Sequence, residues 1–174
     1  ADDQMKGKRA RQAVQDVLQS SSPLVPVLQP HAPRLLALIG GLTLHPVAQL
    51  LLTAAQTARP AHYAHAVAAM ALNGALMAAD GGDDAAVRLA LMSGLLHDVG
   101  EMYIDPLHGE AEADRDLDFA SYQQLVVHPH VGYLLVAQLT NYPAEVARAI
   151  AEHHERLDQS GYPNALGGGK MSPQ

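Results

Sequence analysis

The fold of this chain is constrained most strongly by its apolar segments of helical length. Most of these segments begin with proline or acidic residues and end with glycine or polar residues. Proline is tolerated in the first turn of a helix, glycine commonly follows the last turn, and acidic side chains favour the N-terminal end. Residues 20–30, with three serines and three prolines, predict a linker, and residues 100–119 predict an irregular acidic loop. We expect helices within residues 6–19, 32–41, 45–58, 59–82, 83–98, 130–141 and 143–155.

The composition agrees with helices packed on helices. The chain has 174 residues, enough for one main domain with a substantial core, and only 4% of its residues are aromatic. Alanine is abundant, and small side chains let helices pack closely, whereas a β-sandwich would be richer in valine, threonine and tyrosine. The sequence therefore predicts an all-α fold, a helical bundle of about six or seven helices.

Charge and residue content exclude several classes of protein. The formal net charge of -7 argues against binding of nucleic-acid polymers, because phosphate contacts need clustered lysine and arginine. The chain has no cysteine, which excludes disulfides and thiolate metal sites. Its apolar stretches stop short of the roughly 20 residues of a membrane span, and it lacks a secretory signal pattern. We expect a soluble, cytoplasmic protein without membrane insertion.

Histidines gather at or near the ends of the expected helices. Two of them are adjacent, one precedes a proline at a helix start, and one is followed by an aspartate. Helix ends that meet in space would direct these groups into one pocket. Imidazoles with one carboxylate and no sulfur suit iron, manganese, zinc or cobalt rather than calcium. The candidate ligands are His62, His97, Asp98, His128, His153 and His154.

Other histidines have other interpretations. His65 and His130 lie close in sequence to members of this set and are second candidates for the ligand role. His31 and His45 stand beside helix starts and His108 lies in the acidic loop, so we expect structural or solvated roles for these three. A His-Asp pair by itself is commonly a helix-end hydrogen bond, and only the whole set is specific.

The adjacent histidines favour two metal ions over one. Neighbouring residues of a helix point about 100° apart, so we expect His153 and His154 to reach two ions side by side, and the two oxygens of Asp98 to bridge those ions. A two-metal centre aligns an attacking water and a leaving oxygen for displacement at phosphorus. Its positive charge also attracts a phosphate to an acidic protein.

Four segments between residues 60 and 170 resemble the HD-GYP family, the branch of the HD-domain metal-dependent phosphohydrolases that degrades the bacterial messenger cyclic di-GMP. The segments occur in the order of the family and with similar gaps. They read "HYAHAVA", "LLHDVGEMYIDP", "HPHVGYLL" and "HHERLDQSGYP".

The resemblance implies an HD-domain helical bundle and a reaction. Cyclic di-GMP would be opened to linear pGpG, and often onward to GMP, by a metal-bound hydroxide. It implies metal ligands at the six candidate positions, with Asp98 as the bridge and His97 beside it as the catalytic pair. The cofactors would be two divalent ions, iron or manganese first, with zinc, cobalt or nickel as alternatives. The GYP turn (Gly161–Pro163) would contact substrate and dock diguanylate cyclase domains of the GGDEF type.

Four departures from the family pattern refine these expectations, and the change at Gln159 is the smallest of them. Glu101 stands where the family has a phosphate-binding lysine, so with Arg156 and Tyr162 we place it on the substrate side of the site. Ala58 stands where three-metal members carry glutamate, which favours two metals, and Gln159 replaces a frequent glycine. The sequence also stops before the family's last helix, which carries a final aspartate ligand, so we expect either that this helix is absent from this sequence or that the site is short of a ligand.

The domain organisation follows from the same segments. We expect residues 1–58 to form an N-terminal helical linker or input segment and residues 59–174 the HD-GYP-like domain, with its C-terminal part absent. Glu101 also motivates an alternative function, a catalytically degenerate module that binds a nucleotide or docks a signalling partner. A third hypothesis is an HD phosphohydrolase that acts on another nucleotide.

Overall fold

Helices make up the regular structure of the part described here, residues 2–105 and 118–171 of a computed structural model, which also holds one isolated bridge between Asp158 and Gly167. Two short 3-10 helices are η1 (Gln29–His31) and η2 (Val99–Tyr103). The α-helices are α1 (Asp2–Leu18), α2 (Val25–Leu28), α3 (Ala32–Gly40), α4 (Pro46–Ala58), α5 (Pro60–Ala79), α6 (Asp84–Leu96), α7 (Phe119–Leu125), α8 (His128–Leu139) and α9 (Ala144–Glu152).

The predicted all-α fold is confirmed. Seven of these helices, α1, α3, α4, α5, α6, α8 and α9, have nine residues or more, in agreement with the predicted bundle of six or seven. The start signals act as expected: proline opens α4 and α5, and the Asp83 side chain accepts a hydrogen bond of 2.8 Å from the backbone N–H of Ala86 at the start of α6. His45 caps α4 in the same way, which fits its predicted structural role.

Two segments differ from the sequence-based expectation. The predicted linker contains α2 and η1, and Leu28 at the end of α2 is fully buried, so this proline-rich stretch is packed rather than free. The predicted loop is followed by a helix that was not predicted, since α7 begins at Phe119, where the Asp118 side chain accepts from the backbone N–H of Ser121. Both helices are short, and short helices carry little periodic signal. Residues 106–117, including His108, lie outside the described residues.

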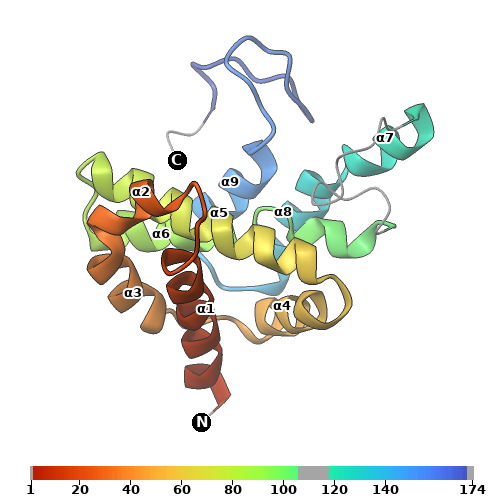
Figure 1. The fold of residues 1–174 in the computed structure, drawn as a ribbon. Coiled ribbons are helices and arrows are strands. Elements are labelled where there is room, and N and C mark those ends of the chain that lie inside the picture. Colours follow the sequence, from red (N-terminus) through yellow and green to blue (C-terminus); the bar gives the residue numbers. More distant parts are fainter. Residues whose placement is uncertain (1, 106–117, 172–174) are drawn as a thin grey trace.

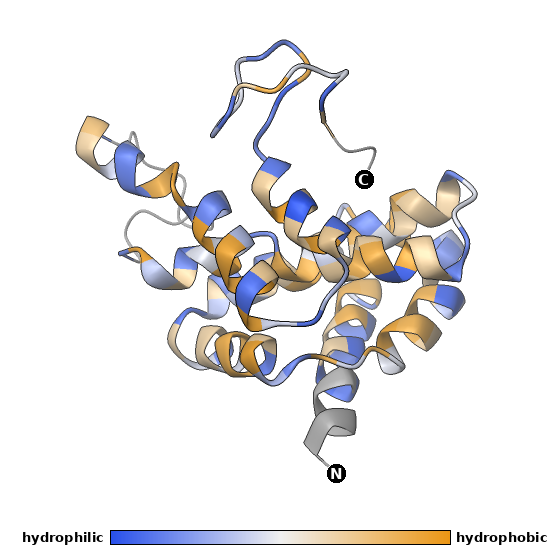
Figure 2. Ribbon diagram, turned by 180° about the vertical axis from the view of Figure 1, so that it is seen from behind, coloured by the Kyte–Doolittle hydropathy of each residue, from blue (hydrophilic) through white to orange (hydrophobic). Residues whose placement is uncertain are grey.

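Helix α5 runs through the middle of the bundle, and its most extensive packing is against α6 (Figure 1). Small buried residues on α5, such as Ala71 and Ala75, let the two helices approach closely, as the alanine content predicted. Apolar residues, orange in Figure 2, run along the helices of the bundle, whereas the segment after α9 is largely blue and white. The segment after α9 rises away from the helices of the bundle (Figure 1).

The first 58 residues share this core. Helix α1 packs against α3 and α5, and the fully buried Val14 belongs to the same apolar cluster as Leu35 and Met70. The N-terminal helices therefore support α5, the helix that carries two of the histidines discussed below. Among the described residues, no helix is both long and apolar enough to cross a membrane.

Candidate metal centre

Asp98 lies at the centre of a group of imidazoles. Helix α6 ends at Leu96, so the chain turns at His97 and Asp98, and the Asp98 side chain is only 1% exposed. On one side, its Oδ2 lies 2.9 Å from Nε2 of His97 and 3.3 Å from Nε2 of His65. On the other side, its Oδ1 lies 3.3 Å from Nε2 of His128 and 3.2 Å from Nε2 of His153.

Two sets of ligand atoms share this carboxylate. Within each set, the candidate ligand atoms lie within 4.8 Å of one another. We call the whole arrangement the Asp98 cluster. Its first set is His65, His97 and Asp98, and its second set is Asp98, His128, His153 and His154.

The protonation of the imidazoles suits a cation. Nδ1 lies 2.7 Å from a backbone carbonyl oxygen in His97, in His128 and in His153. A carbonyl only accepts, so Nδ1 carries the proton and, in the neutral ring, Nε2 presents its lone pair to Asp98. The Nε2 atoms of His128 and His153 are also 3.1 Å apart. Lone pairs that converge on a carboxylate repel one another unless a cation lies between them, so the donor set fits divalent metal ions.

Burial and charge set the titration of this cluster. Burial alone would raise the pKa of Asp98, but the close contacts with the four surrounding imidazoles hold that pKa well below its ordinary value. Burial lowers the pKa of His153, and the contact with Asp98 does not reverse this. Asp98 is therefore charged and His153 neutral at pH 7, the states that metal ligation requires.

The adjacent histidines do not separate as the helical geometry predicted. His153 and His154 fall in the same set with His128, and their ring centroids lie 4.1 Å apart. Helix α9 ends at Glu152, so both residues belong to the turn that follows it, where the rotation of 100° per helical residue no longer applies. The first set instead receives its imidazoles from α5, which carries His65, and from the end of α6, which His97 follows.

The structure brings His65, rather than His62, to Asp98. Both lie on α5, but the His62 ring turns to the neighbouring carboxylate, with Nδ1 3.2 Å from Oε2 of Glu101. His62 and Glu101 are both buried, and the Arg59 guanidinium donates to the backbone carbonyl of Glu101. This pair joins α5 to η2, and Glu101 faces His62 inside the protein. His130 is exposed and stacks on Tyr133, outside the cluster.

The GYP turn contacts the Asp98 cluster through His154. The Tyr162 ring stacks on the His154 ring with centroids 4.4 Å apart and an interplanar angle of 18°. The backbone N–H of Tyr162 donates to the carbonyl of His154, and Gly161 lies so close to this backbone that any side chain there would collide with it. Arg156 is exposed and lies two residues after His154.

Glu155, which the sequence analysis did not single out, holds the rest of the turn. It is 7% exposed, and its Oε1 and Oε2 each accept a 2.7 Å hydrogen bond, from the backbone N–H of Asn164 and of Leu166. The sequence offered one signal for this role, which is the position of Glu155 between the two adjacent histidines and the GYP turn. Glutamate is seldom buried unless its carboxylate has partners. Both oxygens of Glu155 therefore bind the backbone of the turn, whereas the oxygens of Asp98 face the imidazoles of the cluster.

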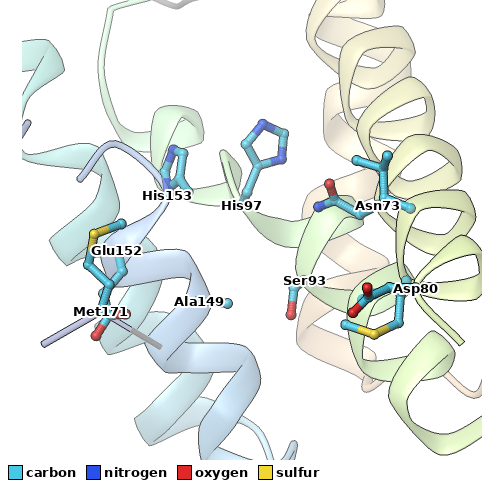
Figure 3. A pocket seen from close by; sticks show the side chains of 11 residues that line it. Asn73, Asp80, Ser93, His97, Ala149, Glu152, His153 and Met171 are labelled. Atoms are coloured by element: carbon cyan, nitrogen blue, oxygen red, sulfur yellow. The ribbon is translucent and has the colours of Figure 1, made fainter. Parts of the chain in front are cut away.

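A cavity of about 330 Å³ adjoins the cluster, between α5, α6 and α9. Figure 3 shows His97 and His153 among the residues that line it, together with Ser93 from α6 and Asn73 from α5. A volume of this size is at the lower end of pockets for small molecules. The two histidines are thus reachable by a ligand, while Asp98 behind them is sealed from solvent.

Gly100 is expected to be sensitive to any side chain. A Cβ at this position would collide with the carbonyl of His128 and lie 2.7 Å from the backbone nitrogen of Gly132. Because backbone atoms cannot turn aside as a side chain can, Gly100→Ala is expected to lower the free energy of unfolding by about 2–3 kcal/mol. Chemical denaturation measures this change. Gly169→Ala, where a Cβ meets nothing within 4 Å, is the control and should change stability by less than about 0.5 kcal/mol.

The sequence of the chain matches a known protein family. The sequence model of the family described as HD domain matches residues 63–173, from α5 to the segment after α9. The chain belongs to the HD domain family. Its match begins two residues before His65 and covers every member of the Asp98 cluster. Membership of the HD domain family, expected from the sequence, is thereby confirmed.

One relative is informative about activity. Over 123 residues, or 70% of the chain, this HD domain protein is 35% identical to Cyclic di-GMP phosphodiesterase PA4108 from Pseudomonas aeruginosa. The matched region makes up 29% of that relative, so the chain spans less than a third of its length. No solved structure gives a significant match.

Proposed function

We propose that the protein is a metal-dependent phosphodiesterase that hydrolyses cyclic di-GMP to linear pGpG, to GMP, or to both. The observation that carries this proposal is the pair of ligand sets that share the buried carboxylate of Asp98. A sequence 35% identical to a cyclic di-GMP phosphodiesterase supports the choice of substrate. The degenerate module motivated by Glu101 is less well supported, because this side chain is buried against His62 rather than exposed to a phosphate.

The cofactors in this proposal are two divalent ions, iron or manganese first, with zinc, cobalt and nickel as alternatives. His65 and His97 would hold one of them, the imidazoles of the second set would hold the other, and Asp98 would serve both. When bound, such a pair lowers the pKa of a water molecule and stabilises negative charge on phosphate oxygens. The protein itself supplies fixed imidazole orientations, through the Nδ1 hydrogen bonds, and a carboxylate that remains ionised.

The remaining assignments are proposals about the surroundings of the site. Tyr162, stacked on His154, and the exposed Arg156 lie where they could contact substrate, and Arg156 adds a positive charge for a phosphate. Docking of a GGDEF-type domain on the GYP turn, an input role for residues 1–58 and a cytoplasmic location also stay predictions.

His65 and His62 are expected to respond differently to substitution. His65→Ala removes an imidazole from the first set, so the full-length protein should lose one equivalent of metal and at least about 10-fold in activity. His62→Gln keeps a side chain able to bond Glu101, so metal content should stay at two equivalents. Elemental analysis after dialysis measures the difference, with Arg34→Gln, far along the chain from the cluster, as the control. Loss of metal in His62→Gln but not in His65→Ala would reverse our assignment.

Hydrolysis by the full-length protein tests the proposed function. After removal of metals with a chelator, the protein should be inactive toward cyclic di-GMP, and addition of Mn²⁺ or Fe²⁺ should restore the formation of pGpG or GMP, followed by liquid chromatography. Binding of cyclic di-GMP without turnover in the metal-loaded protein would support the degenerate module instead. Turnover of a different nucleotide, found in a substrate panel, would support another HD phosphohydrolase.

A further inference from the structure

An aromatic hollow lies beside the GYP turn, separate from the cavity in Figure 3. Its volume is about 410 Å³. It lies between α7, the start of α8 and the turn itself, and two of its large side chains, Tyr122 and Val127, are each 45% exposed. Its walls are formed by Tyr122, Val126, Val127, His130, Tyr162 and Pro163.

The hollow adjoins the Asp98 cluster through Tyr162. This residue lines the hollow and stacks on His154 of the second ligand set. His130, which also lines the hollow, lies two residues after His128 on α8. A ligand held at the cluster by its phosphate could therefore reach this hollow past Tyr162.

The rings around the hollow are arranged for a flat aromatic ligand. Tyr122 and Tyr162 meet edge to face, with centroids 6.3 Å apart and an interplanar angle of 75°, so the face of one ring and the edge of the other are presented together. His130 is held by a stacked contact with Tyr133, at 6.2 Å and 22°. A nucleobase has apolar faces for the tyrosines and polar edges for the imidazole, whereas a phosphate has neither.

We propose that the aromatic hollow binds one guanine base of the cyclic dinucleotide, with Tyr122 as the residue that provides stacking and determines affinity. This inference rests on the proposed function and adds to it a subsite outside the metal cluster. Tyr122 comes from α7, which lies in the sequence between Asp98 and the segments that contribute the histidines of the second ligand set. It binds the base and takes no part in the reaction at phosphorus, so its loss weakens substrate binding and leaves the metal centre intact.

Steady-state kinetics of the full-length, Mn²⁺-loaded protein test this subsite. Tyr122→Ala should raise the KM for cyclic di-GMP roughly 10-fold while kcat stays within about twofold, because loss of base stacking by alanine substitution typically weakens binding by this order. Tyr122→Phe keeps the ring and should retain the original KM. Inhibition by GMP should weaken in Tyr122→Ala by a similar factor, whereas inhibition by inorganic phosphate, which has no base, should not change.

The control is Tyr103→Ala, since Tyr103 is 61% exposed and is not among the residues that line the hollow. Thermal melting of each variant identifies any loss of folding. If the unmodified protein hydrolyses cyclic di-GMP and Tyr122→Ala has an unchanged KM and an unchanged response to GMP, the subsite is refuted while the proposed function stands. If the metal-loaded protein has no activity toward cyclic di-GMP, both are refuted.

Discussion

Asp98→Asn is expected to reduce cyclic di-GMP hydrolysis by roughly 10³-fold or more, because one carboxylate serves both ligand sets. Even partners one step removed from a metal cost about 10–100-fold when they are changed, and Asp98 would contact both ions. Asparagine has the same size, so the buried space remains filled, but the negative charge that offsets the two cations is lost. The metal-loaded variant should bind fewer than two equivalents of metal, measured by elemental analysis beside the rate.

A matched substitution separates this effect from a general loss of charge. Asp16 on α1 is exposed, and its side chain accepts a hydrogen bond from Gln12 one turn away, so Asp16→Asn should keep both activity and metal content. Circular dichroism of the two variants should show the same helical content. Full activity in Asp98→Asn would remove Asp98 from the site altogether.

Glu155→Ala is expected to lower the stability of the protein strongly, because Glu155 holds the GYP turn. The substitution removes two charge-assisted hydrogen bonds to the backbone N–H groups of Asn164 and Leu166 and leaves both donors without their acceptor. We expect the free energy of unfolding to fall by about 3 kcal/mol, measured by urea denaturation. Activity should fall about 10–100-fold as well, since the turn positions Tyr162 against His154.

Two controls make this result specific. Glu145 lies in the first turn of α9 and is exposed, so Glu145→Ala should cost no more than about 1 kcal/mol. Glu155→Gln keeps one acceptor oxygen and should fall between the parent protein and Glu155→Ala. In NMR spectra, the amide signals of Asn164 and Leu166 should shift in both Glu155 variants. Unchanged signals there would show that Glu155 does not hold the turn.

The sequence predicted most of the fold because its helix boundaries carry clear chemical signals. Prolines in the first turns of α4 and α5 and the Asp83 cap of α6 mark where these helices begin. Helices α2 and α7 were not predicted, since four and seven residues are too few to establish a period. The buried Leu28 shows that packing, rather than local propensity, stabilises the proline-rich segment before α3.

The site was predicted only in part from the sequence, for a reason that concerns α5. His62 and His65 are three residues apart, so they lie on nearly the same side of the helix, and local spacing cannot decide which one faces Asp98. The choice depends on Glu101, 39 residues after His62, whose buried carboxylate pairs with that imidazole. His153 and His154 belong to the same ligand set because α9 ends at Glu152 and both residues lie in the turn that follows.

The contact between Glu101 and His62 explains how glutamate can stand where the family pattern has a phosphate-binding lysine. An exposed Glu101 beside a phosphate would repel it, but the side chain is 1% exposed and lies against His62. The pair links η2, which follows Asp98, to the helix that carries His65. In this buried position, Glu101 supports the placement of the metal ligands.

Anomalous X-ray scattering from crystals of the manganese-loaded full-length protein tests the central claim most directly, because it locates metal ions without reference to activity. The account predicts two peaks on either side of the Asp98 carboxylate, one beside His65 and His97 and one beside His128, His153 and His154. A single peak, a peak on His62, or no peak near Asp98 in protein soaked with manganese would contradict it.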